Sequence, residues 1–247
     1  MKFVIAPVVL AFGLACGGGG GSSTPPAPSP FEGPWIGSMY STKTGTSVTA
    51  VALILANGSV RYVGSNGIQG VGSVTGTAAA FQSSGTIYAP TGYTFVGGGT
   101  TSSYALAGTG TSGVSMSGTY TASVDAGTFT FLYDTAADYA QPVVMANVAG
   151  TFQSITTTSG YSTQGRLTSA GGFSGSDAFG GSFTGTLTPV DAAKNAFTVA
   201  ITYSAPGIPA TAFNGLAYFD FGGTTMLNIQ ASAGLNEFAG SFICTGP

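Results

Sequence analysis

The chain has 247 residues, of which only 5% are charged, and it carries five basic and eight acidic residues but no histidine. Typical soluble proteins have about a quarter charged residues, and four basic residues outside the first fifteen cannot form the basic patch that nucleic-acid binding needs. Without histidine the chain lacks the most frequent general base and metal ligand, so we expect no enzyme, no metal or cofactor site and no nucleic-acid partner.

The first fifteen residues have the layout of an export signal. Lys2 is positively charged, and residues 3–14 form an uncharged, mostly apolar run. A membrane-spanning helix needs about 20 apolar residues, whereas a shorter run that ends at small residues is typical of a signal peptide. The run ends in Gly13-Leu14-Ala15-Cys16, which resembles the lipobox of bacterial lipoproteins, with Gly13 where that family usually has Leu. The resemblance implies cleavage before Cys16 and attachment of fatty acids such as palmitate to that cysteine.

Residues 16–30 have the composition of a tether. Glycine and serine dominate 17–23, and four prolines follow in 25–30. Gly/Ser-rich stretches are flexible and Pro-rich stretches are extended, so this segment would hold a folded domain away from a membrane. Gly17 follows the cysteine, where Asp retains enterobacterial relatives in the inner membrane. The resemblance therefore implies lipid anchoring at the outer membrane, with the leaflet left open.

Beyond the tether, apolar residues recur with a period of two. Residues 51–55 and 60–63 flank Asn57-Gly58, which predicts a hairpin with a two-residue type I′ turn. Residues 197–204 alternate strictly. Residues 216–221 and 224–230 flank Gly222-Gly223 and predict a second tight hairpin. The fold class is therefore predicted to be all-β and antiparallel.

Three short motifs recur in the same order. Residues 33–35 match 150–152, residues 72–77 match 181–186, and residues 127–129 match 240–242. Repeats of this kind predict a repeated architecture. We expect lobe 1 at 31–134, a linker at 135–147 and lobe 2 at 148–247. Each lobe has room for about eight short strands, which favours two tandem eight-stranded barrels; the alternative is one larger antiparallel barrel or sandwich.

Two further resemblances concern barrels. Residues 172–185 (GFSGSDAFGGSFTG) resemble strand-turn-strand segments of the transferrin-binding-protein-like lipoproteins, which implies eight-stranded barrels on a lipid tether. Gly33-Pro34-Trp35 resembles the first-strand Gly-x-Trp of lipocalins, and we expect Trp35 to plug a barrel. No functional residue is transferred from either family.

The two predicted hairpins are apolar on both faces, whereas the outside of a barrel wall is usually wet. With two-residue turns, Ile54 and Val63 share one face of the first hairpin, and Phe219 and Met226 share one face of the second. This second apolar face either packs against the other lobe or forms an exposed patch for a partner.

Cys244 has no cysteine partner once Cys16 is acylated, and it shares a strand face with Phe238 and Phe242. We expect a buried thiol. Together these features predict a membrane-anchored, non-catalytic binding lipoprotein at the surface or in the periplasm, with an unidentified partner. The alternatives are a lipocalin-like carrier of a small apolar ligand and a structural or adhesin-like envelope component.

Overall fold

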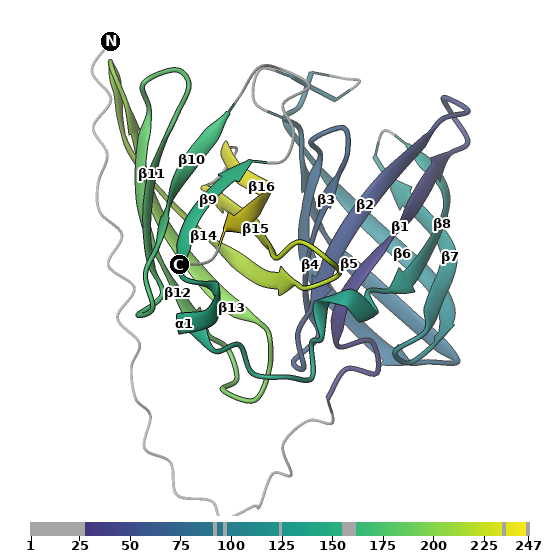
Figure 1. Ribbon diagram of the computed structural model, residues 1–247. Helices are drawn as coiled ribbons and strands as arrows, with labels where there is room; N and C mark the ends of the chain where they lie inside the picture. Colours follow the sequence, from purple (N-terminus) through teal and green to yellow (C-terminus); the bar gives the residue numbers. More distant parts are fainter. Residues whose placement is uncertain are drawn as a thin grey trace, which may run out of the picture.

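The computed structural model describes residues 28–90, 93–95, 98–123, 125–154, 162–233 and 236–245. These residues form two closed antiparallel barrels, lobe 1 and lobe 2, which lie side by side (Figure 1). The prediction of two tandem eight-stranded barrels is confirmed, and the alternative of one larger barrel or sandwich is wrong. Cys16 and the rest of the predicted signal peptide lie outside the described residues.

In lobe 1 each strand pairs with the next one along the chain, and β8 pairs with β1 to close the barrel. Closure leaves no edge strand to pair with another molecule. The strands are β1 Gly33–Ser41, β2 Ser47–Ile54, β3 Ser59–Gly64, β4 Gln69–Thr77, β5 Ala80–Tyr88, β6 Thr101–Thr111, β7 Ser115–Ala122 and β8 Ala126–Tyr133.

Lobe 2 repeats this topology, and its first strand β9 pairs with both β10 and β16. The strands are β9 Gly150–Ser154, β10 Thr163–Leu167, β11 Gly172–Asp177, β12 Ser182–Pro189, β13 Phe197–Ala205, β14 Ile208–Asp220, β15 Met226–Ala233 and β16 Asn236–Thr245.

The recurring sequence motifs lie on equivalent strands of the two barrels. The first pair lies on the first strands β1 and β9, the second on the fourth strands β4 and β12, and the third on the eighth strands β8 and β16. Gly33 and Gly150, which open the first strands, both have a positive φ, of 121° and 149°. The repeat in the sequence is therefore a repeat of the architecture.

The segment between the barrels carries two short helical turns, η1 Thr135–Ala137 and α1 Met145–Val148. Asp134 begins η1 by accepting a hydrogen bond from the Ala136 amide at 3.1 Å. Among the described residues, no helix has both the length and the apolar character needed to cross a membrane.

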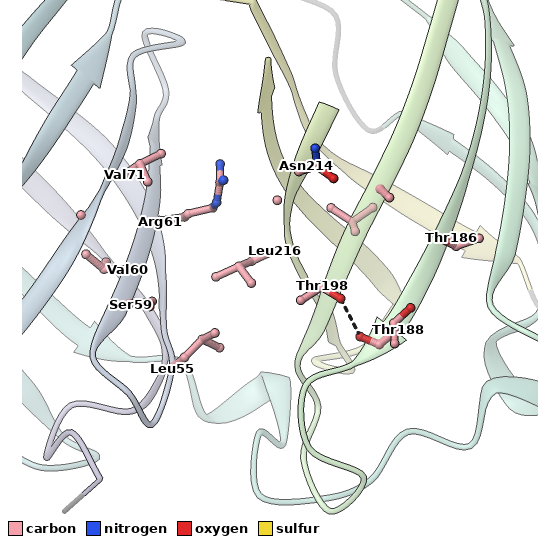
Figure 2. A pocket seen from close by; sticks show the side chains of 14 residues that line it. Leu55, Ser59, Val60, Arg61, Val71, Thr186, Thr188, Thr198, Asn214 and Leu216 are labelled. Carbon is pink, nitrogen blue, oxygen red and sulfur yellow. Dashed lines mark hydrogen bonds between the residues drawn. The ribbon is translucent and has the colours of Figure 1, made fainter. Parts of the chain in front are cut away.

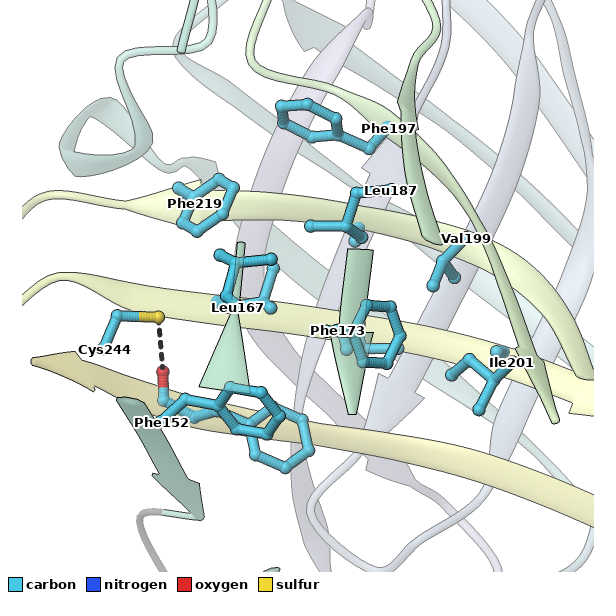
Figure 3. Close-up of a cluster of buried hydrophobic side chains, with 14 of the residues drawn as sticks. Phe152, Leu167, Phe173, Leu187, Phe197, Val199, Ile201, Phe219 and Cys244 are labelled. Atoms are coloured by element: carbon cyan, nitrogen blue, oxygen red, sulfur yellow. Dashed lines mark hydrogen bonds between the residues drawn. The ribbon is translucent and has the colours of Figure 1, made fainter. Parts of the chain in front are cut away.

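Phenylalanine rings fill the interior of lobe 2 (Figure 3). Phe173 and Phe183 point inward from β11 and β12, and each is followed two residues later by a glycine on the same face. A Cβ atom on Gly175 would lie 2.4 Å from the tip of the Phe183 ring. The alternating Phe and Gly residues therefore have a packing role: each of these rings occupies the space over a glycine of a neighbouring strand.

A buried apolar cluster, the seam, joins the outer walls of the two barrels. It contains Leu53 and Leu55 from lobe 1, Ala137 and Tyr139 from the linking segment, and Ala196, Leu216 and Tyr218 from lobe 2. At its centre the buried Asn195 side chain donates hydrogen bonds to the carbonyl oxygens of Ala137 and Phe219, at 2.5 and 2.6 Å. It also accepts one from the Phe219 amide at 2.9 Å. The seam thus contains both apolar contacts and satisfied polar groups.

Candidate functional site

Lobe 1 contains a cavity of about 380 Å³ near the end of the barrel where β1 ends and β2 begins. We call this end the mouth. Its wall is mostly apolar, and its apolar lining includes Met39, Val48, Ala50, Ile68, Ile87 and Leu106. Cavities that hold small organic ligands span roughly 300–1,000 Å³ and combine such walls with a few polar groups. The cavity therefore has the size and lining of a small-ligand site.

The opposite end of lobe 1 is sealed by aromatic side chains. Trp35 is fully buried, as predicted for a barrel plug, and donates its indole N–H to the Phe31 carbonyl oxygen at 2.7 Å. The Phe31 ring packs on Trp35 and on Phe81, with centroid separations of 5.9 and 4.6 Å. A small gap of about 40 Å³, lined in part by Phe81, lies between this plug and the larger cavity. Lobe 1 is consequently shaped as a cup with one closed end.

Two tyrosines line the middle of the cup. Tyr62 and Tyr104 meet edge to face, with ring centroids 5.5 Å apart, and the Tyr104 hydroxyl lies 3.4 Å from the Ser83 hydroxyl. Burial raises the pKa of both phenols, so both stay protonated at neutral pH and can donate a hydrogen bond. The cup therefore offers hydroxyl groups within an otherwise apolar wall.

Inward-facing glycines make room for these rings. A Cβ atom built on Gly70 would lie 1.9 Å from the nearest carbon of the Tyr62 ring, and one on Gly72 would lie 2.4 Å from the Tyr104 hydroxyl oxygen. The rings thus occupy the space over the glycines of the neighbouring strand β4, which leaves the centre of the barrel open.

The rim of the cup is polar and is organised by Asp125. The Asp125 carboxylate accepts hydrogen bonds from the Tyr120 hydroxyl at 2.8 Å and from the Ser41 hydroxyl at 2.7 Å. The Ser41 hydroxyl oxygen in turn accepts a hydrogen bond from the Thr44 amide at 3.1 Å. Burial, followed by the hydrogen bond to Asp125, raises the pKa of Tyr120. This network links strand β1, the β1–β2 turn, β7 and the residue before β8, and so fixes the shape of the mouth.

The structure places the predicted apolar-face residues on different surfaces. Ile54 and Phe219 belong to the buried interior clusters of lobe 1 and lobe 2. Val63 and Met226 are half-buried and lie on the outward faces of β3 and β15. The assignment of Ile54 and Phe219 to a shared outer face is therefore wrong.

The length of the turns explains why Ile54 does not share a face with Val63, nor Phe219 with Met226. Asn57 lacks the positive φ of a type I′ turn, since Asp138 is the only described non-glycine residue with a positive φ. Leu55 instead pairs with Ser59 around a three-residue loop in which Gly58 has a φ of 81°. Leu53 therefore faces Arg61 and not Tyr62. In the second hairpin, residues 221–225 form the loop, and Asp220 faces Met226.

The prediction that the second hairpin is apolar on both faces holds for β14 alone, because Gln230 and Asn228 of β15 lie opposite Leu216 and Tyr218 on the outward face. Leu216 and Tyr218 of β14 point away from the lobe 2 interior and pack in the seam with Leu53 and Leu55. Of the two interpretations, packing between the lobes thus accounts for these outward side chains.

Cys244 is buried beside Phe152 and Phe242, as its place on the strand predicts. Burial raises the pKa of its thiol to about 11, so the group remains protonated at neutral pH. The tyrosines of the cup and Asp125 were not identified from the sequence. The sequence did contain part of the pattern, because Tyr62, Tyr104 and Tyr120 occupy inward positions on strands whose side chains alternate between the two faces.

Searches against protein-family models, curated proteins and solved structures found no match for this chain.

Proposed function

We propose that this protein is a lipid-anchored, non-catalytic binding protein of the bacterial outer membrane, and that the cup of lobe 1 holds a small, mostly apolar ligand. The observation that carries the proposal is the cavity of about 380 Å³, with its apolar wall, buried phenols and polar rim. A ligand with an apolar body and one or two hydrogen-bonding groups matches this lining.

Two features support binding over catalysis. The chain contains no histidine, and burial raises the pKa of the tyrosines in the cup, which favours their neutral form. A phenol held in this form donates hydrogen bonds and does not act as a base. The lipid anchor rests on the lipobox-like residues that end at Cys16.

Binding is tested with the uncharged apolar fluorophore N-phenyl-1-naphthylamine, whose emission rises on transfer from water to an apolar site. We expect saturable enhancement with the unaltered protein. Ala50 is buried and lines the cup, so Ala50→Phe should fill the cavity and remove most of the enhancement. The matched control is Ala105→Phe, which adds the same ring at an exposed position on β6.

Leu106→Trp, a second change in the cavity wall, keeps the test decisive if Ala50→Phe does not fold. Enhancement that persists in folded cavity variants would contradict the ligand proposal. The anchor is tested separately by the intact mass of the protein from native membranes. An acylated chain that begins at Cys16 is expected, and a mass without acyl groups would overturn the anchor alone.

A further inference from the structure

A second cavity, the cleft, lies between the two barrels and is distinct from the cup. Its volume is about 450 Å³. Ser59, Arg61 and Val71 line it from strands β3 and β4 of lobe 1, and Thr188, Thr198 and Asn214 line it from strands β12 to β14 of lobe 2 (Figure 2). Leu55 and Leu216, both members of the seam, form its apolar base.

Arg61 projects from lobe 1 into this cleft (Figure 2). Its side chain is half-buried, and desolvation lowers its pKa. Its guanidinium donates a hydrogen bond from Nη1 to the Ser232 hydroxyl of lobe 2 at 3.1 Å. A guanidinium has five N–H donors, so this bond occupies only one of them.

Arg61 is also a charge without a countercharge in the described structure. Among the side chains that the structure describes, the only ion pair joins Lys194 and Glu32. Moving a cation out of water is costly unless a partner compensates for the lost hydration. In a chain with four basic residues beyond the first fifteen, the placement of one of them in a cavity between two domains indicates a site for an anionic group.

The opposite wall offers uncharged polar groups that complement an oxyanion. Asn214 is exposed on β14 and presents an amide, and Thr198 and Thr188 present hydroxyls. The Thr198 hydroxyl donates to the Thr188 carbonyl oxygen at 3.3 Å. None of the described residues that line the cleft is acidic, so no carboxylate among them repels an anion.

We propose that the cleft binds an oxyanion, a phosphate or a carboxylate group, through the Arg61 guanidinium of lobe 1 and the Asn214 amide of lobe 2. Guanidinium groups bind such anions with paired, charge-assisted hydrogen bonds. Because the two groups come from different barrels, the bound anion would also bridge the lobes. The anion belongs either to a soluble molecule or to a lipid headgroup, and both share this chemistry.

The test measures binding of inorganic phosphate and acetate by calorimetry, and the gain in sedimentation with phosphatidylglycerol vesicles over uncharged phosphatidylcholine vesicles, which takes account of the proposed anchor. Arg61→Gln should weaken binding by about tenfold or more, because a charge-assisted hydrogen bond is worth about 1.5–3 kcal/mol. Arg166→Gln is the matched control, since it removes the same charge from an exposed position on β10 of lobe 2. Asn214→Ala, a change at an exposed residue, should also weaken binding, and it decides the test if Arg61→Gln fails to fold.

The probes separate the two sources of the anion. Arg61-dependent binding of inorganic phosphate or acetate supports a soluble ligand, and Arg61-dependent binding of vesicles alone supports a lipid headgroup. The proposal is overturned if no probe binds, or if Arg61→Gln and Arg166→Gln weaken binding equally. It is also overturned if Arg61→Gln lowers stability while the affinity for every probe is unchanged, because Arg61 would then serve only to dock the lobes.

Discussion

Lys194 of lobe 2 forms an ion pair with Glu32, which lies just before the first strand of lobe 1 and 162 residues earlier in the chain. The Tyr139 hydroxyl donates to the same Glu32 carboxylate at 2.9 Å, and the Lys194 ammonium lies 5.6 Å from the Tyr139 ring centroid. One carboxylate thus receives contacts from the linking segment and from the second barrel.

This ion pair should stabilise the docking of the two lobes. Lys194→Met removes the charge and keeps the apolar stem, and we expect a loss of about 1 kcal/mol, the upper range for a partly exposed pair. Chemical unfolding of Lys194→Met, Glu32→Gln and the double variant forms the appropriate cycle. If the effects of the two single variants add without coupling, the pair does not contribute to docking.

Asn195 should matter more, because its amide is buried and makes hydrogen bonds to the backbone of both η1 and β14. Asn195→Ala leaves those backbone groups without partners and should cost about 3 kcal/mol of unfolding free energy. Asn147→Ala, at an exposed position in α1, is the control and should change stability by less than about 0.5 kcal/mol. A similar small change in Asn195→Ala would show that water replaces these bonds.

Gln230, in contrast to Asn195, has a buried amide without hydrogen bonds to the described residues. Its side chain is 4% exposed, and neither Nε2 nor Oε1 has a hydrogen-bond partner among the described residues. Gln230→Leu removes two buried polar atoms and keeps most of the volume, so we expect about 1 kcal/mol of added stability. Gln164→Leu, at an exposed site on β10, is the comparison, and urea unfolding is the measurement. Destabilisation by Gln230→Leu would indicate that the amide has a partner in solution.

The cup depends on the position of the Tyr62 ring over Gly70. The methyl group added by Gly70→Ala would overlap the Tyr62 ring, so the ring has to move into the cavity. We expect a loss of about 1–3 kcal/mol and weaker binding of the apolar fluorophore. The double variant Gly70→Ala/Tyr62→Leu should recover stability, because the displaced ring is gone. If the double variant is as unstable as Gly70→Ala, the close approach is between backbones and the ring is not the cause.

The Cys244 thiol gives a prediction on pH. Its folded pKa of about 11 lies above the ordinary thiol value of about 8.5, because burial disfavours the thiolate. A raised pKa contributes stability that is fully present below the unfolded value and is lost as pH rises toward the folded value. Compared with Cys244→Ala, the protein should therefore lose stability between about pH 8.5 and about pH 11.

The same burial should make Cys244 slow to react with iodoacetamide at pH 8 in the folded protein and fast in urea. Rapid alkylation of the native protein would contradict the buried position. Mass spectrometry measures both rates.

The strands could be predicted because a half-buried strand shows its period directly, as in the inward series Phe197, Val199 and Ile201. The pairing registers of the hairpins could not be predicted. In the first hairpin only Gly58 has a positive φ, where a type I′ turn needs two such residues, so the loop is one residue longer than expected. An error of one residue moves every side chain of a hairpin to the other face. Val63 therefore shares a face with Leu53 and not with Ile54, and Leu53 and Leu216 lie in the seam.

The cup could not be predicted either, for a different reason. Alternation shows which side chains point inward, but not whether they meet across the barrel. In lobe 2 the Phe183 ring reaches those of Phe152 and Phe173, whereas in lobe 1 the Tyr120 hydroxyl bonds to Asp125 at the rim. Arg61 was visible as one of few cations, but its place between the barrels depends on how the two lobes dock.

The point where the chain enters lobe 1 determines how the cup is oriented relative to the proposed membrane anchor. Ser29 donates its amide to the Ala56 carbonyl oxygen, in the β2–β3 turn, and this turn lies at the end plugged by Phe31 and Trp35. With Cys16 as the proposed anchor, the tether attaches to the closed base of the cup, and the mouth lies at the far end of the barrel. A ligand would then enter from the aqueous side, and one drawn from the bilayer would first have to leave the membrane that holds the protein.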